Sequence, residues 1–247
     1  MGTMWLYAIS VEDVREFFGA PEMLGASLLA SANDVVREPE KPPLIGKVGP
    51  LLRHPITPLV EVPVPTMEDA RAMVEGRALP PERLGVAWVI VRHWCAVRCR
   101  DSVRINVSRD QLATLDFAHV ASGLSSQYSF GTVLSRDPYL PLMPVAGLTV
   151  GWMPNMHLRR MCGQWSTVTA ASTGAPVLGS TNFSRDDPTG VGLTWPLRDT
   201  PEPTEAWHRE WDQEWRLLDE FFKRAAEWSN VPEGLSMLAP DVLAMYQ

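Results

Sequence analysis

The stretch EAWHREWDQEWRLLDEFF, residues 205–222, constrains the fold of this chain most. Placed at about 3.6 residues per turn, its large hydrophobic side chains fall on one side of a helix. The resulting stripe consists of Trp207, Trp211, Trp215, Leu218, Phe222 and Ala225, and it is widened by Phe221 and Trp228. Such a stripe must be covered by a second hydrophobic layer. We therefore predict a long amphipathic helix over about 204–228 that packs against a globular body.

One acidic residue, Glu214, falls inside this stripe, next to Trp211 and Leu218. A carboxylate held among indole rings loses its hydration, which makes it a better proton donor near neutral pH. Glu214 is therefore a candidate catalytic residue, and Trp207, Trp211 and Trp215 are candidate substrate-binding residues. The alternative is that Glu214 lies at the end of a packing interface and reaches solvent or an arginine.

Two histidines are further candidates for proton transfer. His119 follows Asp116 by one helical turn, so this carboxylate could orient the imidazole as a base. His93 lies in a hydrophobic segment with Arg92 and Arg98 nearby. Either arginine could hold a substrate carboxylate through two parallel hydrogen bonds. The alternative for both histidines is a structural side chain bonded within the core.

The composition excludes several classes of protein. The net charge of −7 argues against a general nucleic-acid binder or a binder of anionic membranes. No run of 18 hydrophobic residues is present, so we expect no membrane-spanning helix. The three cysteines are too few and uneven for a disulfide framework, and the first residues do not resemble a signal peptide. We therefore expect a soluble, cytoplasmic protein with reduced thiols.

Common cofactor motifs are missing from the sequence. There is no GxGxxG after a strand, no GxxxxGK[ST], no HExxH, no CxxC and no GxSxG. His157 has methionines and Cys162 nearby, a set that suits Cu(I), but copper sites have tighter and repeated spacing. We therefore predict no organic cofactor and no bound metal.

The order of local signals predicts an α+β fold in a single domain over 1–247. MWLYAIS reads as a strand, and Ser10 is an N-cap for the helix that follows. Residues 37–66 contain eight prolines with many hydrophobic residues between them, so we expect an ordered connection, with an edge strand at VEVPV. Thr66 is expected to begin a helix. The segment RLGVAWVIVRHWCAVRC is expected to form a buried second helix, and Ser108 to begin a third.

The second half of the chain is expected to differ from the first. Between about 122 and 199, turn-forming residues separate short hydrophobic runs, which predicts a β-rich middle. The predicted strands are YSFGTVL, VAGLTVGWM, WSTVTAA and VGLTWPL, with a short helix over NMHLRRMCGQW. The long helix at 204–228 follows, and a short terminal helix over 240–246 completes the prediction.

The segment TMEDARAMVEGRALPPERLGVAWVIVRHWC (66–95) resembles a pattern in an uncharacterised family of actinobacterial proteins. The opening MWLYAISVEDVREFF and the later DPYLPLMP (137–144) extend this resemblance over about residues 1–150. The family has no assigned activity, so the resemblance implies no catalytic residue.

Three functions fit these observations. The first is a small cofactor-independent enzyme that performs acid–base chemistry (condensation, cyclisation or isomerisation) on an aromatic or amine-bearing small molecule. The second is a non-catalytic interaction protein, of the immunity or accessory type, that uses an aromatic-rich acidic surface. The third is a metal-dependent enzyme whose histidine and acidic ligands come from distant segments. We leave a homodimer open as the state in which any of these would act.

Overall fold

The structure is a computed structural model. In the helix over 155–174, side chains are described only up to residue 165. In the helix over 205–229, they are described only from residue 213. The described residues are 2–19, 29, 33, 64–108, 111–113, 115–116, 125–142, 145, 147–174, 205–230 and 240–247. The predicted connection at 37–66, its strand VEVPV, His119 and the predicted strand VGLTWPL therefore lie wholly or almost wholly outside the described residues.

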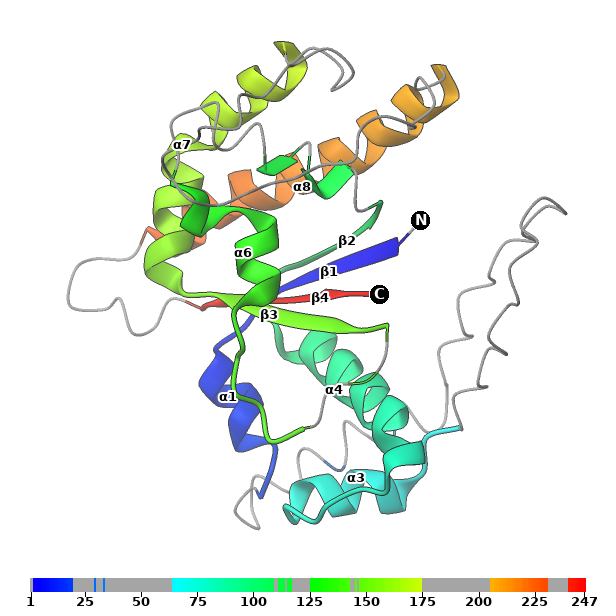
Figure 1. The fold of residues 1–247 in the computed structure, drawn as a ribbon. Helices are drawn as coiled ribbons and strands as arrows, with labels where there is room; N and C mark the ends of the chain where they lie inside the picture. The colour runs from blue at the N-terminus through cyan, green and yellow to red at the C-terminus, as the bar shows by residue number, and fades with distance from the viewer. Residues whose placement is uncertain are drawn as a thin grey trace, which may run out of the picture.

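A four-stranded antiparallel sheet forms the middle layer of the fold (Figure 1). Its strands are β1 (Gly2–Ala8), β2 (Ser102–Val107), β3 (Thr149–Met153) and β4 (Val242–Tyr246), in the order β2-β1-β4-β3. Trp5 of β1 lies opposite Arg104 of β2, and Leu6 lies opposite Ala244 of β4. The two ends of the sequence thus meet in the centre of the sheet.

Helices cover both faces of the sheet, so the fold has three layers (Figure 1). Side chains alternate along a strand: Met4 and Leu6 of β1 point to one face, whereas Trp5 and Tyr7 point to the other. The first face is covered by α6 (Phe130–Ser135), α7 (Asn155–Gly174) and α8 (Glu205–Ser229). The second is covered by α1 (Val11–Glu16), α3 (Met67–Val74) and α4 (Leu84–Arg98).

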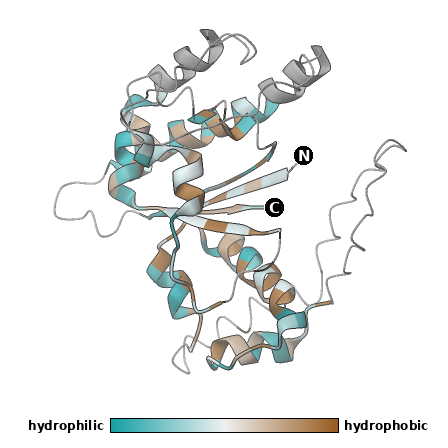
Figure 2. Cartoon of the chain, in the orientation of Figure 1, coloured by the Kyte–Doolittle hydropathy of each residue, from teal (hydrophilic) through white to brown (hydrophobic). Residues whose placement is uncertain are grey.

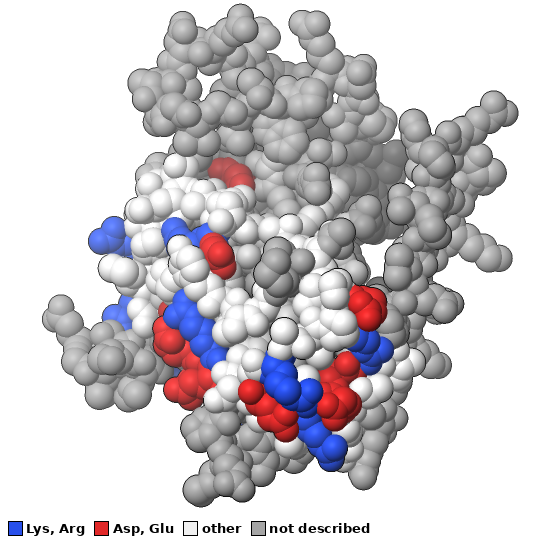
Figure 3. All heavy atoms as spheres, turned by 60° about the horizontal axis from the view of Figure 1, so that its bottom comes forward, with Lys and Arg blue, Asp and Glu red and all other residues white. Residues whose placement is uncertain are grey.

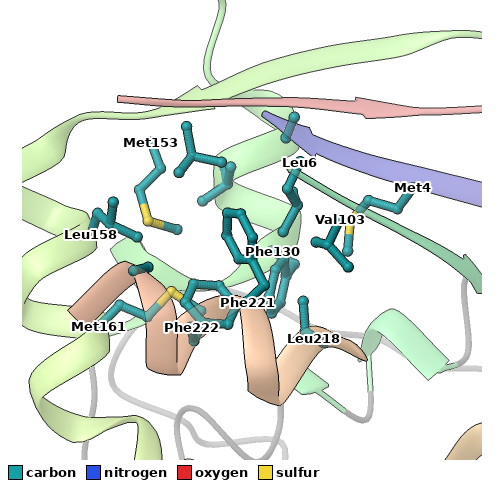
Figure 4. Close-up of a cluster of buried hydrophobic side chains, with 14 of the residues drawn as sticks. Met4, Leu6, Val103, Phe130, Met153, Leu158, Met161, Leu218, Phe221 and Phe222 are labelled. Atoms are coloured by element: carbon teal, nitrogen blue, oxygen red, sulfur yellow. The ribbon is translucent and has the colours of Figure 1, made fainter. Parts of the chain in front are cut away.

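The core under α8 is rich in aromatic side chains (Figure 4). Phe221 and Phe222 of α8 meet Phe130 of α6, and the Phe130 and Phe222 rings lie edge to face at 6.1 Å. Trp165 of α7 stacks on Trp215 with ring centres 5.5 Å apart. This packing confirms the long amphipathic helix that the tryptophan stripe predicted, at Glu205–Ser229.

The opposite core is built around α4, which is hydrophobic on most sides. Figure 2 shows that most residues of α4 are hydrophobic, whereas the described part of α8 contains both hydrophobic and hydrophilic residues. Val86, Ala87, Ile90, Val91 and Cys95 of α4 are fully buried. The structure thus confirms the buried helix predicted from RLGVAWVIVRHWCAVRC.

Local capping signals also formed as predicted. Ser10 accepts the N–H of Asp13 at the start of α1. Thr66 and Asp69 form a reciprocal capping box at the start of α3. Burial alone would raise the pKa of Asp69, but hydrogen bonds from Arg83 and Thr66 outweigh it and lower the pKa below its usual value.

Asp241 joins the two helical layers where β4 begins. Its carboxylate accepts the N–H of Val11 in α1 at 3.3 Å and that of Asn155 in α7 at 2.9 Å. One side chain therefore caps a helix on each face of the sheet.

Some predicted elements were wrong. The predicted terminal helix at 240–246 is strand β4. WSTVTAA continues helix α7, and YSFGTVL forms a 3-10 turn and α6. Within the described part of 122–199, β3 confirms the strand expected in VAGLTVGWM. Strand β2, from SVRINV, was not predicted although its residues alternate between exposed and buried.

Asp116 caps α6 from a short helical segment. Its carboxylate accepts the N–H groups of Phe130 at 2.5 Å and Gly131 at 2.9 Å. Burial nevertheless raises the pKa of Asp116 to about 6, against the lowering effect of these two bonds. Asp116 therefore holds the start of α6 in place. Its role in orienting His119 stays a prediction.

This shift predicts how stability depends on pH. The pKa of Asp116 is higher in the folded state than in the unfolded chain. Between about pH 4 and 6, the carboxyl group is therefore protonated in the folded state and ionised in the unfolded chain. As the pH rises from about 4 to 6, the contribution of Asp116 to the free energy of unfolding should fall by about 2 kcal/mol, allowing for its partial exposure. Urea unfolding at several pH values would measure it. In Asp116→Asn this component should vanish, and a variant that keeps the full slope would contradict the assignment.

None of the helices in the described part of the chain is both long and hydrophobic enough to cross a membrane. The end of the molecule that carries α3 is charged, and acidic and basic groups lie side by side there (Figure 3). Arg77 pairs with Glu68 and Glu75, and Arg83 pairs with Asp69.

Candidate functional site

Glu214 is bound to the edge of the sheet. One carboxylate oxygen accepts the backbone N–H of Asn106 at 2.8 Å, and the other accepts the side-chain amide of Asn106 at 3.1 Å. Asn106 belongs to β2, whose outer edge has no neighbouring strand among the described ones. The acid that interrupts the hydrophobic stripe therefore satisfies a backbone donor of an edge strand.

This contact predicts a graded effect of substitutions. Glu214→Gln keeps an oxygen for the Asn106 N–H and should lower the free energy of unfolding by about 0.5–1 kcal/mol. Glu214→Leu completes the hydrophobic stripe but removes both bonds, and it should cost about 1–3 kcal/mol. Chemical denaturation of both variants would measure these values. A Glu214→Leu protein as stable as the parent would show that the bonds to Asn106 contribute nothing.

A second polar contact holds α8 at the other end of β2. Arg224 donates from Nε and Nη2 to the two carboxylate oxygens of Asp101, at 2.8 and 3.0 Å. Such two-pronged pairs are stronger and more directional than single bonds. With Glu214 on Asn106 and Arg224 on Asp101, α8 runs antiparallel to β2.

The described part of the tryptophan stripe is mainly core. Leu218, Phe222 and Ala225 are buried, and Trp215 is half-buried against Trp165. Trp207 and Trp211 lie on α8, but their side chains fall outside the described residues. Substrate binding by these three tryptophans stays a prediction.

The other predicted site residues lie on the opposite face of the sheet. The guanidinium of Arg92 in α4 stands 4.7 Å from the ring centre of Trp5. His93 is half-buried with its Nε2 atom unbonded, and Arg98 is exposed in the last turn of α4. The sheet separates these residues from the α8 layer, so Glu214 and His93 do not form one site. Their catalytic roles stay predictions.

A pocket of about 420 Å³ lies where the end of α8 meets the start of β2. This volume is in the range of pockets that hold small molecules. Trp228 supplies a hydrophobic wall, and its ring stands 6.0 Å from the guanidinium of Arg100. The lining residues are Arg100, Asp101, Arg224, Glu227 and Trp228.

The charges in this pocket fall into two kinds. Asp101 and Arg224 neutralise each other through their paired bonds. Arg100 and Glu227 are exposed, and within the described residues their charged groups have no ion pair. Within the described part of the chain, the pocket therefore presents one positive and one negative group that have no ion pair, beside an indole ring.

These pocket residues were not singled out from the sequence, apart from Trp228 as part of the stripe. The alternation in SVRINV could have revealed β2 and thus placed Arg100 and Asp101 at its start. The meeting of β2 with the end of α8 depends on contacts more than 120 residues apart along the chain, between Asp101 and Arg224. Local sequence signals do not report such contacts.

Two alternative functions were predicted from the sequence, a metal-dependent enzyme and an interaction protein. No group of three or more histidine, cysteine, aspartate and glutamate side chains able to hold a metal lies within the described residues. Their large exposed hydrophobic residues come from separate parts of the sequence: Val64, Val97, Tyr139, Met156 and Leu217. The metal-dependent enzyme and the interaction protein stay predictions.

Comparison with known proteins gives no relative. No protein-family model, curated protein or solved structure matches the chain. The resemblance of residues 1–150 to the actinobacterial family therefore stays a prediction, and function must be argued from the geometry alone.

Proposed function

We propose that the protein binds a small molecule that carries both a carboxylate and an amine, in the pocket formed by Arg100, Glu227 and Trp228. The observation that supports this proposal is a pair of opposite charges beside an indole ring, neither of which has an ion pair among the residues that the structure describes. Arg100 suits the carboxylate because a guanidinium can donate two parallel hydrogen bonds. Glu227 suits the amine, and the small exposed part of the Trp228 ring adds a hydrophobic contact.

The proposal includes cofactor-independent acid–base chemistry on this ligand, of the condensation, cyclisation or isomerisation kind. Glu227 is the carboxylate in the pocket without an ion pair in the described residues, so it takes the role of the counter-ion that holds and orients the ammonium group of the ligand. An interaction partner could use the same charges, and two probes that each lack one charge test whether a small molecule is recognised here.

The test uses three related probes: tryptophan, tryptamine and indole-3-propionate. Calorimetric titration should show saturable binding of tryptophan, with weaker binding of the two analogues that lack one charge. Arg100→Gln should remove the preference for the carboxylate, and Glu227→Gln the preference for the amine. The matched controls are Arg71→Gln and Glu16→Gln, two exposed residues on α3 and α1. Equal binding by all variants, or no preference among the probes, would overturn the proposal.

A further inference from the structure

Several arginines in the described residues form ion pairs with acids. Arg15 pairs with Glu12, Arg83 with Asp69 and Arg224 with Asp101. Figure 3 shows the same intermixing of charges over the end that carries α3. This pattern is expected in a protein with a net charge of −7. Two arginines in another part of the described structure lie close to the same histidine instead.

Arg136 and Arg160 meet around His157 and Tyr128, and neither has a carboxylate partner in the described residues. Arg136 follows α6, and its Nη1 lies 3.0 Å from Nδ1 of His157 in the first turn of α7. Arg160 lies one turn later in α7 and donates from Nη1 to the Tyr128 hydroxyl at 2.9 Å. The Tyr128 and His157 rings are in edge-to-face contact at 5.0 Å. We call these four residues the basic cluster.

The proton on His157 is fixed by its neighbour. A guanidinium only donates hydrogen bonds, so Nδ1 of His157 must accept and the hydrogen of the neutral ring lies on Nε2. Partial burial lowers the pKa of His157, and the positive charges of Arg136 and Arg160 lower it further. The ring is therefore neutral at pH 7, and it offers one N–H beside two guanidinium groups.

One member of the cluster, Tyr128, is buried, whereas Arg136 and His157 are half-buried and Arg160 is exposed. Tyr128 is only 4% exposed, and its hydroxyl fixes the guanidinium of Arg160. Arg136 is further held by a 3.4 Å contact from Nη2 to the carbonyl oxygen of Gln127. The nearest acid in sequence, Asp137, accepts the N–H of Tyr139 at 2.7 Å. Within the described residues, the two guanidinium groups therefore have no carboxylate that balances their positive charges.

We propose that the basic cluster is a binding site for a phosphate group of a small-molecule ligand. A phosphate monoester carries two negative charges, which two guanidinium groups balance. A carboxylate ligand carries only one negative charge and would leave one guanidinium group unbalanced. The Nε2–H of His157 supplies a further donor to a phosphate oxygen. This site shares no residue with the pocket of Arg100, Glu227 and Trp228, so it is independent of the function proposed there.

The first test is binding of inorganic phosphate to the whole protein at constant ionic strength, with chloride as the balancing anion. Thermal unfolding and the NMR signals of the His157 ring should both respond and saturate with the same dissociation constant. A response that chloride reproduces, or that leaves the His157 signals unchanged, would overturn the proposal.

Variants then locate the site. Arg136→Gln and Arg160→Gln should each weaken phosphate binding by roughly tenfold or more, because each removes charge-assisted hydrogen bonds. Arg71→Gln removes an equal charge from α3 and should leave the affinity unchanged. If Arg160→Gln does not fold, Arg160→Lys can replace it. Lysine keeps the charge but lacks the two parallel N–H donors of a guanidinium group, so it should still weaken binding. Parent-like affinity in the Arg136 and Arg160 variants would rule the site out.

A pH series separates binding from a purely structural role. Sulfate keeps both charges across the range, so its affinity reports only on the protein. Affinity for sulfate should rise as the pH falls through the pKa of His157, because the ring then gains a positive charge. The groups that face this ring are Arg136, Arg160 and Tyr128, of which the arginines keep their charge throughout. In His157→Gln the pH dependence should disappear, and a retained dependence would contradict the role of this ring.

Discussion

Replacing Trp165 with alanine should lower the free energy of unfolding by about 3–5 kcal/mol. The Trp165 ring is 3% exposed, stacks on Trp215 and contacts Phe222 with ring centres 4.3 Å apart. Its removal leaves a cavity between α7 and α8 that neither helix can easily fill. Urea denaturation followed by circular dichroism would measure the loss.

A second variant separates packing from hydrogen bonding at this position. Trp165→Phe keeps an aromatic ring but loses the indole N–H that donates to Asp219 at 2.9 Å. We expect a smaller loss, about 1–2 kcal/mol. Equal losses for alanine and phenylalanine would show that the hydrogen bond, rather than the ring, holds the two helices together.

Gly151→Ala should lower the free energy of unfolding by about 3 kcal/mol, at the upper end of the range for overpacked cores. A Cβ atom on Gly151 of β3 would lie 2.0 Å from the carbonyl oxygen of Val133 and 2.6 Å from Cα of Leu134. Both atoms belong to the backbone of α6, so relief requires the helix to move away from the sheet.

Gly163 provides the matched control for this substitution. It lies in α7, and a Cβ atom there would meet nothing within 4 Å. Alanine favours a helix over glycine, so Gly163→Ala should raise the free energy of unfolding by about 0.5–1 kcal/mol. Thermal unfolding should thus shift in opposite directions for the two variants. The same direction for both would contradict the packing of α6 on β3.

The helices were predictable where their signals are local. Ser10 and Thr66 cap helices that begin where expected, because a cap involves residues only three apart. The stripe on α8 predicted that helix over its full length for the same reason. These interactions do not depend on the rest of the chain.

Strand β4 could not be predicted in the same way. Val242, Leu243, Ala244 and Met245 are all buried, so the strand lacks the alternation that marks a half-exposed strand. Pro240 before it resembles a helix start. Its identity as a strand comes from pairing with β1, about 240 residues earlier, where Met4 lies opposite Tyr246.

The candidate site was harder still to predict. Glu214 stood out because its position contradicted the pattern, but its partner Asn106 is 108 residues away. The desolvated acid inferred from sequence is in the structure a hydrogen-bonded acceptor at the sheet edge. His157 and Arg160 share a helix face, yet only the folding of Tyr128 and Arg136 against them brings the cluster together.

The contact between Glu214 and Asn106 also bears on how copies of this protein behave in concentrated solution. An edge strand with unbonded N–H groups is a template on which another chain can add a strand and start an aggregate. The carboxylate of Glu214 occupies one such group on β2, and a negative charge at the edge repels an incoming acidic chain. In a protein that carries excess negative charge, this acid protects solubility as well as anchoring α8.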